Sequence, residues 1–223
     1  MTKALLCISM TVLFTGIPAL AEPPSPGPSS AANQYMHEAD FDELVARFED
    51  PERAQWQKPQ EIVASLGSLE GKTVADIGAG TGYFSFLVAK KAHQVIAIDI
   101  DQRFLDYIDR KKQTQKNAPN IETRLTVPDS PGLKPNEADM VLIIDTFHHI
   151  EDRVEYLKNL KRGLRNGGVL VIIDFKKEKT PPGPPVELRV AQAQVESELR
   201  SAGFTVVSSD EKVLPYQYVI KAR

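Results

Sequence analysis

Cysteine is nearly absent from this sequence of 223 residues, because Cys7 is the only one. It lies in an apolar N-terminal segment, after Leu6, where a lipoprotein signal would have a small residue. Removal of that segment would leave a chain without a thiol. Such a chain has no disulfide, no cysteine nucleophile and no thiolate metal site.

A basic excess is missing as well. The chain has 27 Lys and Arg residues against 30 Asp and Glu residues, and its net charge is −3. Proteins that bind nucleic acid usually carry a basic excess or a clustered basic face, so nucleic acid is disfavoured as a partner. His, Asp and Glu show no spacing typical of a metal site, so we expect no metal.

Long hydrophobic runs are absent after the first residues. Ala4–Ile17 is mostly apolar, Ala19–Ala21 has the small-x-small pattern of a cleavage site, and prolines follow it. This layout predicts a signal peptide over residues 1–21, cleaved after Ala21, and export to the periplasm or the medium. The alternative is an uncleaved membrane anchor, although the run is short for a spanning helix. After cleavage we expect no membrane span.

The remaining chain divides into a linker and one domain. Residues 22–36 are rich in Pro, Ser and Ala, which predicts a disordered linker. Residues 37–223 suffice for a single domain. We expect helices near 40–48 and from residue 59, and then alternating strands and helices. The strands are expected near 73–77, 94–99, 121–126, 139–145, 168–175, 204–208 and 214–221, and the helices near 83–92, 102–116, 151–164 and 187–202.

This alternation predicts an α/β fold with a parallel sheet and helices on both faces. The last two strands are separated by a short polar turn, without room for a helix. They are therefore expected to form an antiparallel hairpin at the end of the sheet.

The strongest local signal is the segment 74–85. An apolar strand carries Asp76, and Gly78, Gly80 and Gly82 follow in alternation before a helix begins. Glycines permit a tight turn and close approach of a ligand to the backbone. A dinucleotide site would have its third glycine one residue later. An acid at position 76 suits the ammonium group of a cationic ligand, although a plain strand-to-helix turn is the alternative.

A second apolar strand, 95–98, ends in Asp99. Asp99 follows Gly78 by about twenty residues, the spacing at which an acidic residue reaches a ribose diol. A carboxylate can accept hydrogen bonds from both hydroxyls. The alternative is a helix cap, but Asp101 is better placed to cap the helix that begins at Gln102.

These two motifs, followed by Ala138–Leu142 and Leu164–Leu170, resemble the ordered motifs of class I S-adenosylmethionine (SAM)-dependent methyltransferases. The resemblance covers about residues 60–221. It implies a Rossmann-like seven-stranded sheet of order 3-2-1-4-5-7-6 with the last strand antiparallel. It also implies that SAM lies across the carboxyl ends of the first four strands. The predicted cofactor-binding residues are Asp76, Gly78, Ala79, Gly80, Gly82, Asp99, Ile100, Asp129, Asp145 and Thr146.

Several site residues have open alternatives. Many members of the family carry an aspartate after the third strand that reaches the adenine amino group. Val127 stands there in this chain, so Asp129 takes that role or is an exposed turn residue. Asp145 and His148 are the candidate catalytic residues, with His148 as a base or as a packing residue. Trp56, the only tryptophan, is either a lid over the pocket or an anchor for its helix.

The resemblance implies methyl transfer from SAM to an acceptor that the sequence does not identify. The sulfonium is a strong electrophile, so positioning and exclusion of water can suffice without a base. A small molecule is the expected acceptor, and a protein side chain is the second choice. SAM is made in the cytosol, so an exported chain raises the alternative of a non-catalytic module that retains a SAM-type pocket. The sequence leaves the oligomeric state open.

Overall fold

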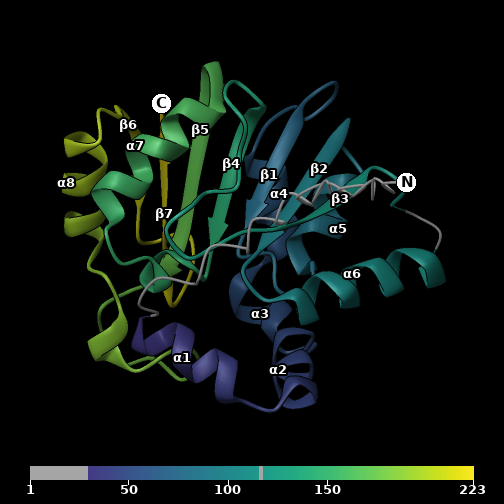
Figure 1. Ribbon diagram of the computed structural model, residues 1–223. Coiled ribbons are helices and arrows are strands. Elements are labelled where there is room, and N and C mark those ends of the chain that lie inside the picture. Colours follow the sequence, from purple (N-terminus) through teal and green to yellow (C-terminus); the bar gives the residue numbers. More distant parts are fainter. Residues whose placement is uncertain (1–29, 116–117) are drawn as a thin grey trace, which may run out of the picture.

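The computed structural model describes residues 30–115 and 118–223 and contains the seven-stranded sheet that the sequence predicts (Figure 1). The strand order is β3-β2-β1-β4-β5-β7-β6, and β7 runs antiparallel to both of its neighbours. Both the order and the closing hairpin are confirmed. The strands are β1 (Thr73–Ile77), β2 (Gln94–Asp99), β3 (Ile121–Leu125), β4 (Ala138–Ile144), β5 (Leu164–Phe175), β6 (Val206–Asp210) and β7 (Gln217–Ala222).

Helices cover both faces of this sheet. The face with α4, α5 and Ile108 of α6 forms one apolar cluster, and the face with α7 and α8 forms the other. The central strand β1 is buried over its whole length, as a strand with both faces covered must be. These helices are α4 (Pro59–Ser65), α5 (Tyr83–Ala89), α6 (Gln102–Gln115), α7 (Arg153–Gly163) and α8 (Gln192–Ser201), and two short 3-10 turns are η1 (Phe147–His149) and η2 (Val186–Leu188).

Three short helices precede the sheet and lie beside the carboxyl ends of its parallel strands (Figure 1). They are α1 (Ala31–Glu38), α2 (Phe41–Phe48) and α3 (Arg53–Gln57), and residues 31–57 are called the cover below. Asp40 caps α2, because its carboxylate accepts hydrogen bonds from two backbone N–H groups of the first turn. The α2 rings of Phe41 and Phe48 lie 5.1 Å and 5.6 Å from the ring of Phe104 in α6.

The first of these helices corrects the predicted linker. Residues 31–36 are helical, whereas we expected disorder as far as residue 36. Ser30 caps α1 through a 3.1 Å hydrogen bond from the Asn33 N–H, and Ala32 is buried. Asn33 also bonds His149, a contact 116 residues away that composition does not reveal. The predicted signal peptide, residues 1–21, and linker residues 22–29 lie outside the described residues.

None of the helices within residues 30–115 and 118–223 combines the length and apolar character needed to cross a bilayer.

The packing of α7 on the sheet gives a direct test of the fold. Leu157 is fully buried in the cluster beneath α7. Leu157→Ala should lower the free energy of unfolding by about 2–5 kcal/mol, since it removes apolar contacts and leaves a cavity. Val207, 56% exposed on the edge strand β6, supplies the control. Val207→Ala should change stability by less than about 0.5 kcal/mol in the same denaturant titration, and equal losses for the two variants would contradict this packing.

Candidate functional site

The glycine loop, residues 78–82, links β1 to α5 at the carboxyl edge of the sheet. Gly78, Gly80 and Gly82 all have positive φ, with values of 70°, 53° and 75°. A side chain is disfavoured in this conformation. The N–H groups of Gly78 and Ala79 donate to the Ile98 carbonyl at 2.8 Å and 3.0 Å, so β2 holds the loop in place.

Gly78 also meets the end of β4. A Cβ atom on Gly78 would lie 2.3 Å from the side chain of Thr146, so no other residue fits. The Thr146 hydroxyl donates to the Ile144 carbonyl at 2.9 Å, which fixes its orientation. The structure therefore brings together two predicted site residues that are far apart in the sequence.

Thr81 is the residue of the loop that sequence reasoning missed. It is buried, and its hydroxyl has no hydrogen-bond partner, the one such side-chain atom found among the described residues. Buried polar groups are normally bonded, so an orphan hydroxyl between two glycines indicates a place for a ligand atom or a water. Its position between Gly80 and Gly82 was a signal available in the sequence.

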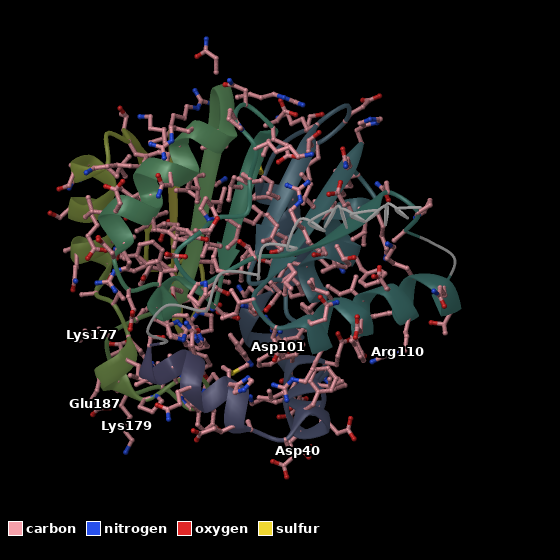
Figure 2. The ribbon with its side chains drawn as sticks, viewed as in Figure 1. Asp40, Asp101, Arg110, Lys177, Lys179 and Glu187 are labelled. Carbon is pink, nitrogen blue, oxygen red and sulfur yellow. The ribbon has the colours of Figure 1, made fainter. Side chains whose placement is uncertain are left out.

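Asp99 lies opposite the loop, at the end of β2. Its carboxylate accepts hydrogen bonds from the backbone N–H groups of Gly80 at 2.8 Å and Asp101 at 3.0 Å. Burial raises the pKa of Asp99 to about 6, although these hydrogen bonds favour the charged form. Asp101 caps α6 as predicted, since its carboxylate accepts from the Arg103 N–H at 2.9 Å. Figure 2 shows Asp101 between the sheet and the cover.

Two exposed apolar side chains adjoin Asp99. Ile100 is 40% exposed, and Leu125, which pairs with Asp99 across β2 and β3, is 53% exposed. Exposed aliphatic surface next to a carboxylate suits a flat ring attached to a ribose. Asp129 is an exposed residue in the loop that follows β3, so its predicted adenine contact stays a prediction.

Asp76 is buried at the end of β1 and is held by one neighbour. The Ser85 hydroxyl of α5 donates to its carboxylate at 2.6 Å. Burial raises the pKa of Asp76 to about 6, against the opposing influence of Ser85 and Arg53. Ser85 was not predicted, although it lies three residues past the last glycine of the motif.

Asp145 follows β4 in a left-handed conformation, with a φ of 56°. Its carboxylate accepts hydrogen bonds from Arg53 at 3.0 Å, from Gln57 at 2.8 Å and from Gln217. Burial raises the pKa of Asp145, and Arg53 opposes that shift. These three partners come from the cover and from β7, and no local motif in the sequence marks them.

His148 is paired with Asp174 of β5. Its ring Nδ1 lies 3.0 Å and 3.1 Å from the two carboxylate oxygens, and its backbone N–H donates at 3.0 Å. Burial acts to lower the pKa of His148, but the charge and hydrogen bond of Asp174, together with the charge of Asp145, outweigh it and raise that pKa. Burial acts to raise the pKa of Asp174, and His148 outweighs it in turn. Sequence reasoning missed Asp174 as the partner.

His149 faces the cover. Its ring Nδ1 lies 2.9 Å from the Asn33 side-chain oxygen of α1, and burial, followed by the charge of His148, lowers its pKa to about 3. A neutral His149 therefore serves as a contact for α1 at neutral pH.

Trp56 contacts two aromatic rings at the end of the sheet. Its ring centroid lies 5.7 Å from that of Phe175 and 6.2 Å from that of Tyr216. These contacts anchor α3 beside β5 and β7. Because α3 is itself part of the cover, the anchor and the lid proposed for Trp56 are compatible.

Among the residues that the structure describes, no group of three or more His, Cys, Asp or Glu side chains is arranged to hold a metal ion.

Comparison with known proteins gives a consistent result. Residues 75–172 match the model of a family described as a methyltransferase domain. The crystal structure of a SAM-dependent methyltransferase from Aquifex aeolicus superposes with a TM-score of 0.76 and 28% identity, covering 83% of this chain and 98% of that one.

Two curated relatives differ in the molecules that their names say they act on. Phosphoethanolamine N-methyltransferase 1 of Caenorhabditis elegans is 34% identical over 49% of this chain and 23% of its own length. The tRNA U34 carboxymethyltransferase of Alteromonas mediterranea is 28% identical over 54% of this chain and 37% of its own length. The chain thus spans well under half of either relative.

The residues present fit SAM in three respects. The positive-φ glycine loop admits a ligand close to the backbone, the orphan Thr81 hydroxyl faces no protein partner, and Asp99 offers a carboxylate beside exposed apolar surface. The sheet order and the comparisons agree with this chemistry. The chain therefore has the fold of class I SAM-dependent methyltransferases, its residues 75–172 match a methyltransferase domain, and the cofactor that these matches support is SAM.

Proposed function

We propose that this protein transfers the methyl group of SAM to a small-molecule acceptor. The observation that carries the proposal is the meeting of the glycine loop with Asp99, joined by the 2.8 Å hydrogen bond from the Gly80 N–H. The loop would hold the amino-acid end of SAM, Asp99 the ribose, and Ile100 with Leu125 the adenine ring. Asp76 would act behind the loop, toward the ammonium group.

When bound, SAM supplies an electrophilic methyl carbon, so that an acceptor lone pair forms the new bond while the carbon–sulfur bond breaks and sulfur keeps the electron pair. The chain contributes placement and shielding. The cover lies over the loop, with the Phe48 ring 3.4 Å from the position of a Cβ on Gly80. A site closed in this way excludes water and restricts the approach of the acceptor.

The structure supports positioning over base catalysis. Both carboxylate oxygens of Asp145 accept hydrogen bonds from side-chain donors. His148 is buried, with its Nδ1 bonded to Asp174, and this burial restricts access to its remaining ring nitrogen, Nε2. Methyl transfer can proceed without a base when the acceptor already carries a free lone pair.

The acceptor class rests on charge. One relative is named for methylating a phosphoethanolamine and another for acting on tRNA. This chain has a net charge of −3, and nucleic-acid binding favours a basic surface. We therefore favour a small molecule over tRNA. A methyl-release assay with labelled SAM over a metabolite panel, with bulk tRNA as a parallel arm, tests this choice. Transfer to tRNA alone would refute it.

Export is a further part of the proposal. It rests on the apolar segment Ala4–Ile17 and the small residues Ala19–Ala21. Mass spectrometry of the protein from the cell envelope or the medium of its source should find Glu22 as the first residue. An intact Met1 in the soluble cytosolic fraction would contradict it.

The pKa of Asp99 predicts how cofactor binding depends on pH. The ionised carboxylate is the form that accepts hydrogen bonds from a ribose, and its pKa is about 6. Affinity for S-adenosylhomocysteine (SAH) should thus be constant near pH 7 and fall as the pH drops through 6. The loss should reach about tenfold per pH unit for one group, and more if Asp76 also takes part. Calorimetry at pH 5, 6 and 7 measures it.

Asp99→Asn provides the control for that titration. It should weaken binding at pH 7 by about 1–3 kcal/mol and flatten the pH dependence, because the titrating acceptor is gone. If the SAH affinity of this variant is unchanged, or depends on pH as steeply as that of the wild type, Asp99 does not bind the cofactor.

His148 separates catalysis from packing. His148→Ala leaves Asp174 buried without its partner, so the free energy of unfolding should fall by about 3–5 kcal/mol. Turnover per folded molecule should stay within about tenfold of the wild type, because positioning does not need this base. Loss of about 10²–10⁴-fold in turnover with stability retained would instead identify His148 as a general base.

A further inference from the structure

The polar network around Asp145 joins four separate parts of the chain. Arg53 and Gln57 reach the carboxylate from α3, and Gln217 reaches it from the start of β7. The guanidinium of Arg53 also donates to the Phe48 carbonyl at 2.9 Å, which ties in the end of α2. One carboxylate at the end of β4 thus bonds α3 to the sheet and, through Arg53, connects it to the end of α2.

The donors are also bonded to one another. Arg53 Nε donates to the Gln57 side-chain oxygen at 2.5 Å, and Gln57 Nε2 lies 3.2 Å from the Gln217 side-chain oxygen. Both glutamines are fully buried. Buried amides left without partners are costly, so these bonds form or break together rather than singly.

The cover touches the glycine loop from the same side. Phe48 lies against Gly80, and the Arg53 guanidinium lies 4.6 Å from the ring centroid of Tyr83 at the start of α5. Arg53 therefore links the Asp145 network to the residues that lie against the loop. Lys58, between α3 and α4, has a left-handed conformation with a φ of 49°, and α4 beyond it is packed in the core through Ile62 and Val63. Lys58 is thus the boundary between the cover and the fixed domain.

We propose that Asp145 holds the cover, residues 31–57, closed over the methyl-transfer site. It does so through its hydrogen bonds with Arg53, Gln57 and Gln217, and these bonds together are called the latch below. Asp145 is then a positioning residue and not a catalytic one. The role given to closure rests on the proposed function, because it assumes methyl transfer at this site. The hydrogen bonds of the latch are present in the ligand-free chain and can be tested without a ligand. Opening hydrates the carboxylate and its donors together, which keeps the cost of opening small enough for ligand exchange.

Trp56 makes the latch measurable, because it is the only tryptophan in the chain and lies within α3. In the closed state its ring packs on Phe175 and Tyr216. Acrylamide quenching and the emission maximum of Trp56 therefore report closure directly. Asp145→Asn removes the charge and retains a residue type that tolerates a positive φ. It should raise the quenching constant and shift the emission maximum to longer wavelength while the far-ultraviolet circular dichroism stays unchanged.

A second variant disrupts the hydrogen bonds of Asp145 from β7. Gln217→Glu keeps the size of the side chain but places a carboxylate against Asp145, and it should open the cover in the same way. Glu52→Gln is the matched control, because Glu52 is exposed at the start of α3 and its side chain makes no hydrogen bond there. This control should leave the Trp56 signals at their wild-type values.

The outcomes are separable. Increased Trp56 exposure in Asp145→Asn and Gln217→Glu, with Glu52→Gln unchanged, supports the latch, and turnover should then fall mainly through kcat. If Asp145→Asn does not fold, the Trp56 quenching of Gln217→Glu alone decides whether the latch holds the cover closed. Wild-type quenching in every folded latch variant overturns the proposal. A wild-type chain that binds no SAH overturns the proposed function instead, and leaves the result of the ligand-free quenching intact.

Discussion

The parallel pairing of β1 with both β2 and β4 determines where the parts of the site lie. Ile77, the last residue of β1, is level with Ile98 on one side and Ile143 on the other. Strands β1, β2 and β4 therefore end at the same edge of the sheet, and Gly78, Asp99 and Asp145 lie at these strand ends. Ligands bind at this point in open α/β sheets, where the strand order reverses. The contact between Gly78 and Thr146 is a direct result of this register.

Four aspartates gather near this edge, three of them buried and Asp145 half-buried, and each is stabilised in a different way. Asp76 has a serine hydroxyl, Asp99 has two backbone N–H groups, Asp145 has the donors of the cover, and Asp174 has His148. A buried carboxylate is costly unless it is paired or hydrogen-bonded. Asp76 and Asp99 both keep a pKa raised to about 6 in spite of their bonds, so both would gain from further donors, such as ribose hydroxyls at Asp99.

Local patterns in the sequence predicted the strands, the glycine loop and the position of Asp99, whereas the sheet order followed from the resemblance to class I SAM-dependent methyltransferases. Alternating apolar runs define the strands, and the spacing of glycines defines the turn. The role of Asp145 was not predictable in this way. Its partners Arg53 and Gln217 lie 92 and 72 residues away in the sequence, and only the folded chain brings them together. The same holds for the pairing of His148 with Asp174, and for α1, which docks on His149 through Asn33.

Positioning and closure together describe how a chain without an evident free base could transfer a methyl group. The loop and Asp99 would set the place of the cofactor, and the cover would set the environment of the reacting atoms. Asp145 connects the two, since it follows β4 within the site and holds α3 from there.

A crystal structure of the chain with SAH would show whether the glycine loop and Asp99 form the cofactor site. We expect the ribose hydroxyls within hydrogen-bond distance of the Asp99 carboxylate, the amino-acid end over residues 78–82, and the adenine ring against Ile100 and Leu125. SAH bound elsewhere, with Asp99 bonded only to the backbone N–H groups of Gly80 and Asp101, would contradict it.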